Sequence, residues 1–476
     1  MIDIQRKFKY KFFFILIIAV LIFLFYFFFN LNYLTTFIDE KGDCITYDYY
    51  VRLGLPQFLY NPHHIWFDAL GLKMLNFVKE KGYKDSSMII LQLRNLLISS
   101  IGLSLFFVLF YQFSKKILLS LLVTFLIAFT CGYWIYTQIN DTPLIHSVLL
   151  MVLFLVLLLF ENIKRKSLFA VFLGLLHSIT IFFHQSDVIF GFVIVIYILF
   201  SKSEKKVDND KELNKMIIQK PKMTINLKSN IKYILFYTIT SIIIVSSAYY
   251  YTGVVKIGLT LDINKAQDFN KIKNSTYFFN WLILYAKIDY WGKGYKKGNT
   301  FTKSIYGITT YFYQPTTYNN KSVTYDLDDI GETRNILPNM LLILFIFPLI
   351  FFIFNFKRLL LFYNNKIISL IVFILIYTAF SGWWEPDYRE FWVATLMSYW
   401  LFILFIYNYI IDKTHYFKMV VKLLIYNLML VTILLLFITN FTGFLYQYSN
   451  KKMQKFDIIQ NIDSSKLKSH PITEIK

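Results

Sequence analysis

The strongest constraint on the fold is a series of apolar runs, each about as long as a helix needs to cross a bilayer. A helix rises about 1.5 Å per residue, so about 20 apolar residues cross a hydrocarbon core of about 30 Å. The first run, residues 12–29, follows a basic segment and lacks the small-residue cleavage site of a signal peptide after it. We therefore expect a retained first transmembrane helix whose basic end is cytoplasmic.

Further runs of this kind predict an all-α, polytopic membrane protein with about eleven transmembrane helices. Hydrophobic residues make up 57% of the chain and aromatic residues 20%, well above the values of soluble proteins. We treat residues 1–439 as a single transmembrane domain and residues 440–476 as a C-terminal tail. The other expected spans are 88–113, 117–136, 143–160, 167–183, 188–200, 233–251, 340–356, 367–380, 393–409 and 419–439.

The charge pattern fixes an expected orientation. The net charge is +20, and the Lys and Arg residues mostly flank apolar runs, where they meet anionic lipid headgroups. The lipid bilayer is thus the expected partner, and nucleic acid is not. One orientation satisfies every short connection: it places the linker 201–232 in the cytoplasm and the connections 30–87 and 252–339 outside. The composition suggests a bacterial plasma (inner) membrane, with the endoplasmic reticulum as the alternative.

The first outer connection carries an acidic cluster directly after the first span. Asp39, Glu40 and Asp43 stand where a carboxylate can be held in a partly dry crevice. A carboxylate in such a place can act as a general base. The structural alternative is an acidic helix terminus without a chemical role. We expect chemistry here. The spacing of the residues does not identify whether Asp39 or Asp43 is the base.

Two adjacent histidines follow in the same connection. His63 and His64, after Asn61-Pro62, can bind a phosphate, ligate a metal with the acidic residues, or cap the helix expected near residue 65. The spacing typical of zinc ligands is absent, so the metal stays unknown. A divalent cation remains an open option, and no cofactor is certain. The two cysteines, Cys44 and Cys131, are too few for a disulfide framework.

Two later outer turns carry similar residues. His184 is either a supporting polar group or part of a plain interfacial turn. In the turn 383–392, Arg389 among acidic residues that include Glu385 and Asp387 is either a structural ion pair or an anion clamp. Because the unusual polar residues all fall on the predicted outer face, we expect a shared site there. His146 and His177 lie within predicted spans and are expected to be satisfied core residues.

The first connection resembles that of the GT-C superfamily of polyprenyl-phosphate-sugar glycosyltransferases. It is most similar to the protein O-mannosyltransferase and aminoarabinose transferase branches, whose first outer loop carries an acidic motif and then a His-Pro segment. Here Asp39-Glu40 or Asp43 matches the acidic motif. Pro62-His63-His64 matches the second segment with the order of Pro and His altered. The resemblance covers residues 1 to about 200.

The resemblance implies an enzyme that moves a sugar from a polyprenyl-phosphate or polyprenyl-pyrophosphate donor to a lipid, glycan or protein acceptor, with inversion. Asp43 or Asp39 would be the base, and Glu40 would support it or bind a metal. The implied substrate and phosphate contacts are His63, His64, His184, Glu385, Asp387 and Arg389.

Two other functions stay open. One is a polysaccharide polymerase or ligase that uses lipid-linked glycans. The other is a non-enzymatic transporter or flippase of lipid-linked sugars, which predicts polar groups near the bilayer midplane and scattered outer clusters.

Overall fold

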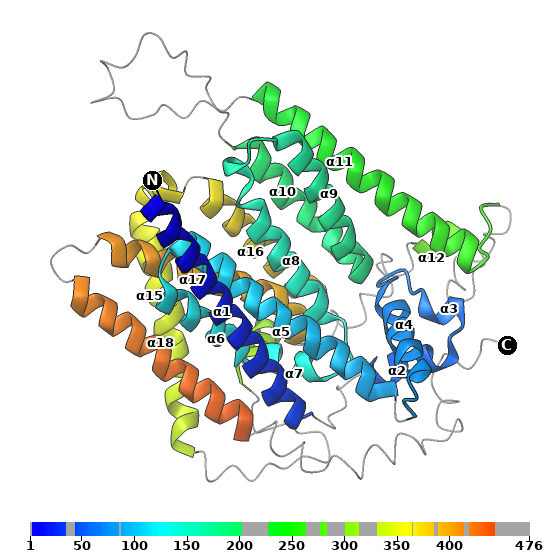
Figure 1. The fold of residues 1–476 in the computed structure, drawn as a ribbon, viewed down its shortest axis with the longest axis horizontal. Helices are drawn as coiled ribbons and strands as arrows, with labels where there is room; N and C mark the ends of the chain where they lie inside the picture. The colour runs from blue at the N-terminus through cyan, green and yellow to red at the C-terminus, as the bar shows by residue number, and fades with distance from the viewer. Residues whose placement is uncertain are drawn as a thin grey trace.

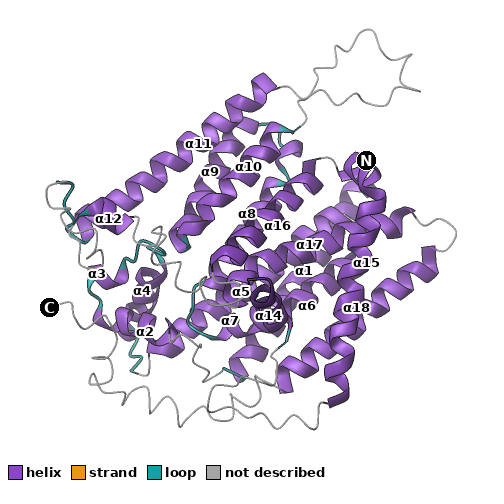
Figure 2. Cartoon of the chain, turned by 180° about the vertical axis from the view of Figure 1, so that it is seen from behind, coloured by secondary structure: helices purple, strands orange, loops and turns teal. Residues whose placement is uncertain are grey.

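A computed structural model describes residues 2–34, 43–84, 87–201, 227–262, 277–282, 300–313, 331–363, 365–384, 389–413 and 418–442. For residues 2–10, 43, 300, 331–335 and 418, it describes the backbone alone. Within these ranges the regular structure is helical, and a single isolated bridge joins Thr260 to Tyr277 (Figure 2). The predicted all-α class is therefore confirmed for the described part of the chain.

Nine described helices are long and apolar enough to cross a membrane, and a bent pair would make ten. The bent pair is α6 (Ile117–Ala128) with α7 (Cys131–Gln138). The run expected at 188–200 forms a shorter helix, α10 (Phe190–Leu199), after the 3-10 turn η2 (Gln185–Ile189). The nine helices are α1 (Ile2–Asn32), α5 (Ser87–Ser114), α8 (Pro143–Leu157, continued by the 3-10 turn η1, Phe160–Asn162), α9 (Lys166–Phe183), α11 (Leu227–Tyr250, continued by the π-turn η3, Tyr251–Lys256), α15 (Gly331–Tyr363), α16 (Asn365–Trp384), α17 (Arg389–Lys413) and α18 (Lys418–Asn440).

Helix α17 forms the centre of the bundle. It packs against α6, α8, α15, α16 and the short helix α14 (Thr300–Phe312). Nearly all of its side chains from Trp392 to Ile411 are buried, as expected for a helix that is apolar on every side. Helices α1, α11 and α18 lie at the periphery and expose many apolar side chains (Figure 1). The chain is thus a multi-pass membrane protein whose outer helices present an apolar surface to lipid.

Helix α14 comes from the stretch 252–339, which the sequence treats as one long connection. Its Tyr311 is fully buried and lies against Gly132 of α7. The connection therefore returns to the interior of the bundle, and α12 (Phe278–Leu282) packs separately against η3.

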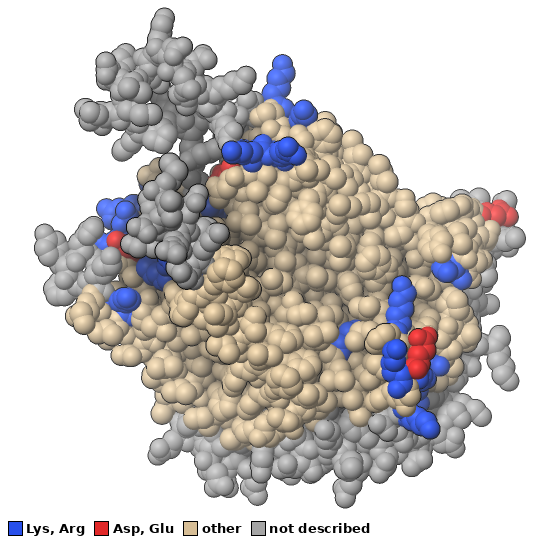
Figure 3. Space-filling view, viewed as in Figure 1, with Lys and Arg blue, Asp and Glu red and all other residues tan. Residues whose placement is uncertain are grey.

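Charged side chains mark the two ends of the bundle. On the face shown in Figure 3, Lys and Arg gather near the start of α1 and again over α4, at the opposite end. The exposed charged residues of α4 and its C-terminal turn include Lys73, Lys79, Glu80 and Lys81. A broad band without charged side chains separates the two groups, as expected for a surface that faces hydrocarbon.

The break between α6 and α7 bends the chain by 64°. A break within a membrane bundle leaves backbone carbonyls unpaired unless neighbouring helices supply donors. Tyr26 of α1 donates its hydroxyl to the Ala128 carbonyl at 3.2 Å, and Asn440 of α18 donates to the Phe129 carbonyl at 2.8 Å. Two helices far apart in sequence therefore stabilise the break, which the sequence analysis treated as a continuous span.

The first connection folds into a helical cap at one end of the bundle (Figure 1). It contains α2 (Asp43–Leu53), α3 (Pro56–Leu59) and α4 (Phe67–Glu80). Val51, Leu59 and Leu75 of this cap bury their side chains with Ile90 and Leu91 of α5. We call this side of the molecule the cap end.

Close packing of α9 on α11 depends on a glycine. A Cβ added at Gly174 would lie 2.8 Å from the backbone oxygen of Tyr237 and 2.9 Å from Cβ of Thr240. Small residues let membrane helices approach closely enough for backbone contact. Because a main-chain oxygen cannot rotate away, the helices must separate to accept a larger side chain.

We expect Gly174→Ala to lower the free energy of unfolding by about 1–3 kcal/mol, the usual cost of overpacking. The measurement is the thermal unfolding midpoint of the detergent-purified chain. Gly382→Ala is the matched control, because among the described residues its Cβ would meet only Ser304 Oγ, at 3.8 Å. Equal midpoints for the two variants would contradict this account of the α9–α11 contact.

Candidate functional site

The candidate site lies where the first connection meets the junction between α9 and α10. The backbone N–H of Gln185 donates to the His63 carbonyl at 2.7 Å, and the N–H of Trp66 donates to the Phe182 carbonyl at 3.1 Å. These two bonds fasten segment 63–66 beside segment 182–185. The rings of His63 and His184 consequently lie 4.1 Å apart between centroids.

Three further contacts fix the same segments. Tyr249 of α11 donates its hydroxyl to the Pro62 carbonyl at 2.9 Å. Gln185 donates its amide to the Leu282 carbonyl of α12 at 2.9 Å. The indole of Trp384, at the end of α16, stacks at 5.7 Å from the ring of His63. The position of His63 is therefore set by segments from four parts of the chain.

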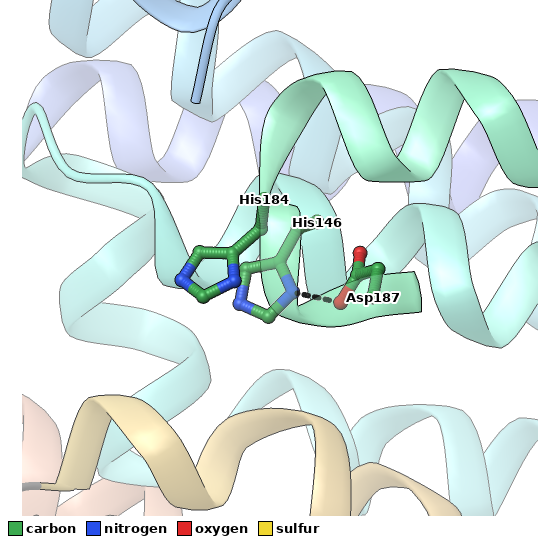
Figure 4. A group of neighbouring side chains, drawn as sticks. All are labelled: His146, His184 and Asp187. Carbon is green, nitrogen blue, oxygen red and sulfur yellow. Dashed lines mark hydrogen bonds and ion pairs between the residues drawn. The ribbon is translucent and has the colours of Figure 1, made fainter. Parts of the chain in front are cut away.

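Beside this junction, His146, His184 and Asp187 form a buried cluster (Figure 4). His146 comes from the first turns of α8, His184 from the end of α9, and Asp187 from η2. Nδ1 of His146 lies 3.2 Å from Oδ1 of Asp187, and the two imidazole rings stack at 4.3 Å. One ligand atom from each residue falls within 4.8 Å of the others. We call these three residues the His–His–Asp cluster.

Supporting contacts orient the cluster. The hydroxyl of Tyr377 donates to Oδ1 of Asp187 at 3.3 Å, and the Ser186 hydroxyl contacts Nδ1 of His184. His177 binds the Asp187 main-chain oxygen through Nε2 at 2.8 Å. The Tyr237 hydroxyl meets the other nitrogen of His177 at 2.6 Å. Since a carbonyl only accepts, His177 carries its proton on Nε2 and is a satisfied core residue, as the sequence predicted.

His64 and Asp68 form a second buried pair next to the junction. Nδ1 of His64 lies 3.9 Å from Oδ2 of Asp68, and neither this nitrogen nor either carboxylate oxygen of Asp68 has a hydrogen-bond partner among the described residues. The rings of Tyr47 and Phe67 cover His64. Burial lowers the pKa of His64 to about 3 and raises the pKa of Asp68 well above its usual range, although Arg94 opposes the second shift. His64 is therefore a neutral imidazole at physiological pH.

Burial also lowers the pKa of His184, and the nearby imidazoles of His63 and His146 act in the same direction. A neutral imidazole can donate one hydrogen bond or ligate a metal, but it brings no positive charge to a phosphate.

A buried arginine links the cap to the start of α8. Arg94 of α5 donates to the Phe67 carbonyl at 2.6 Å and to Oδ1 of Asn140 at 2.8 Å. Asn140 in turn donates to the Cys44 carbonyl of α2 at 3.2 Å. Asn95, the next residue, donates to the carbonyls of Ile139 and Asp141, each at 2.8 Å. This network positions both α4 and the turn that precedes His146.

The structure brings only some of the predicted site residues together. His63, His64 and His184 are neighbours. Arg389 is buried at the start of α17 and donates to Sγ of Cys131 at 3.5 Å. Asp43 begins α2, and its side chain is outside the described part. Asp39, Glu40, Glu385 and Asp387 lie outside the described residues.

His146 is the site residue that sequence reasoning missed. It was treated as a core residue because it falls in an apolar run. The sequence feature that could have identified it is Pro143, because proline favours the first position of a helix. His146 is then the fourth residue of that helix and lies within one turn of its start. His146 therefore lies near the turn that contains Asn140 and Asp141, and not at the middle of the span.

Comparison with solved structures finds a likeness to the crystal structure of the Archaeoglobus fulgidus oligosaccharyltransferase in complex with zinc and sulfate. The TM-score is 0.49 and the sequence identity is 13%. The alignment covers 90% of this chain and 53% of that one, so this chain spans about half the length of that structure. At this level, the likeness assigns neither an activity nor a residue role. No family model and no curated protein sequence matches the chain.

The lowered pKa of His64 predicts a specific pH dependence. Its usual pKa is 6.5 and its folded value is about 3. Between these values the unfolded chain takes up a proton that the folded chain excludes. The stability that depends on the neutral ring is therefore complete above about pH 6.5 and is lost as pH falls toward 3. We expect acidification from about pH 7 to about pH 5 to cost the wild type about 2 kcal/mol more than His64→Asn.

The measurement is the unfolding midpoint of both proteins in detergent at the two pH values. The pKa of His184 is also lowered and the pKa of Asp68 is raised. Both residues are present in the wild type and in the variant, so their contributions to the pH dependence are common to the two proteins. Equal losses for the two proteins would show that His64 is not held neutral.

Proposed function

We propose that the protein is a membrane glycosyltransferase that moves a sugar from a polyprenyl-phosphate or polyprenyl-pyrophosphate donor to an acceptor at the cap end. The observation that carries the proposal is the convergence of polar groups at this end of an apolar bundle. The first connection, the start of α8, the α9–α10 junction and the end of α16 contribute His63, His146, His184 and Trp384 to one place. The resemblance of the first connection to that of GT-C enzymes supports the same activity.

The chemistry requires a base for the acceptor and neutralisation of the departing phosphate. Phosphate is already a good leaving group, so the paired acid and base of a glycosidase is unnecessary. A carboxylate of the first connection, Asp39, Glu40 or Asp43, takes the proton of the acceptor hydroxyl. Attack on the face opposite the phosphate gives inversion at the anomeric carbon.

The proposed phosphate contacts have different characters. His64 and His184 would meet a phosphate as neutral groups, because burial lowers the pKa of both. Arg389 keeps its charge under all physiological conditions and is the cation among the proposed contacts. Glu385 and Asp387, which precede Arg389 in the sequence, would bind its guanidinium or the donor sugar.

The proposed orientation follows from the charge pattern of the connections: the cap end faces outward and the N-terminus is cytoplasmic. The proposed membrane is the bacterial plasma membrane, which the composition suggests, with the endoplasmic reticulum as the alternative. Donor and acceptor would then both reach the site from the outer leaflet, the donor through the bilayer.

Single replacement of the first-connection carboxylates tests the base. We expect at least one of Asp39→Asn, Glu40→Gln and Asp43→Asn to lower the transfer rate by about 10²-fold or more, the usual contribution of a general base. Membranes that contain each variant are supplied with lipid-linked sugars extracted from the source organism, and loss of sugar from the lipid is followed by mass spectrometry.

Glu80→Gln is the matched control, because Glu80 is an exposed carboxylate of the same connection at the end of α4. It should transfer at the wild-type rate. Full transfer by all three test variants would remove the first-connection carboxylates from the mechanism.

A further inference from the structure

We propose that His146, His184 and Asp187 bind one divalent transition-metal ion of the zinc class. Two imidazoles and one carboxylate form a donor set that suits Zn²⁺, Fe²⁺, Co²⁺ or Mn²⁺, whereas Ca²⁺ and Mg²⁺ prefer oxygen ligands throughout. The binding itself does not depend on the proposed function. Its role in transfer does.

The spacing of the cluster is close to that of a coordination shell. Ligands at about 2.1 Å from a tetrahedral zinc ion lie about 3.4 Å from one another. Nδ1 of His146 and Oδ1 of Asp187 are already 3.2 Å apart. One ligand atom from each of the three residues lies within 4.8 Å of the other two, so a modest contraction brings the set to the spacing of a coordination shell. Without an ion, a proton between His146 and Asp187 occupies part of the same space.

Unused polar atoms point to a ligand at this place. Oδ2 of Asp187 is buried and has no hydrogen-bond partner among the described residues. A buried carboxylate oxygen without a partner is costly unless a cation satisfies it. The Ser186 hydroxyl contacts Nδ1 of His184 and holds this ring beside His146. A metal would convert the unmet oxygen of Asp187 into a ligand.

The surroundings have the features of a metal site. Ligating groups are commonly held by further hydrogen bonds that fix their orientation. Here Tyr377 donates to Asp187, His177 binds the Asp187 main chain, and Ser186 contacts His184. Three protein ligands leave one coordination position open, which is the arrangement of catalytic zinc sites.

The role of the ion rests on the proposed function. The open position would take a phosphate oxygen of the lipid-linked donor, next to His63. A divalent charge in this buried site would neutralise a departing phosphate.

Metal binding is measured on the full chain purified in detergent, stripped with a chelator and then equilibrated separately with Zn²⁺, Mn²⁺ and Mg²⁺. We expect about one Zn²⁺ or Mn²⁺ ion per chain by elemental mass spectrometry, and no stable Mg²⁺. His146→Gln, His184→Gln and Asp187→Asn should each weaken binding at least 10-fold. His415→Gln, a replacement between α17 and α18, and Asp412→Asn are the controls and should bind as the wild type does.

A thermal unfolding series separates lost binding from misfolding. Zn²⁺ should raise the unfolding midpoint of the wild type and of the controls, because a ligand that binds only the folded chain stabilises it. Each ligand variant should unfold cooperatively with no such shift.

The absence of a bound ion in the wild type would overturn the site. Binding by all three ligand variants with the affinity of the wild type would also overturn it. Metal binding without sugar transfer would retain the site and refute the proposed function. Sugar transfer by the chelator-stripped protein would retain the proposed function and refute the role of the ion in it.

Discussion

The guanidinium of Arg94 is the contact on which the arrangement of the cap end depends. It is fully buried, and its donors reach the α4 backbone and the side chain of Asn140, which in turn holds α2. A buried cation must be paired or hydrogen-bonded to be tolerated. The first connection is therefore locked to the turn before α8, and this lock places segment 63–66 against the end of α9.

Much of the bundle could be predicted from the sequence, because a run of about 20 apolar residues is a local property. Every expected span coincides with described helical structure, although the run at 117–136 forms the bent pair α6 and α7 and the run at 188–200 is shorter than a full crossing. The break between α6 and α7 could not be predicted. Its carbonyls are satisfied by Tyr26 and Asn440, which only the folded bundle brings to Ala128 and Phe129.

The site was predicted in part. The alternation of basic connections indicated that His63, His64 and His184 share one end, and the structure places them together. His146 was assigned to the core because its neighbours are apolar, although the structure places its ring on that of His184. Arg94 was not singled out, since one cation in a long apolar run carries no signal about its partners. A transporter was expected to have scattered outer clusters. The structure instead places these groups together at one end.

The central claim is that this protein consumes a lipid-linked sugar at the cap end. It is tested most directly by mass spectrometry of lipid-linked sugars and glycans from cells with and without the gene. The account predicts that one polyprenyl-linked sugar accumulates in the deletion strain, that one glycan modification disappears, and that the wild-type gene reverses both changes. Unchanged lipid-linked sugars and unchanged glycans in the deletion strain would contradict it.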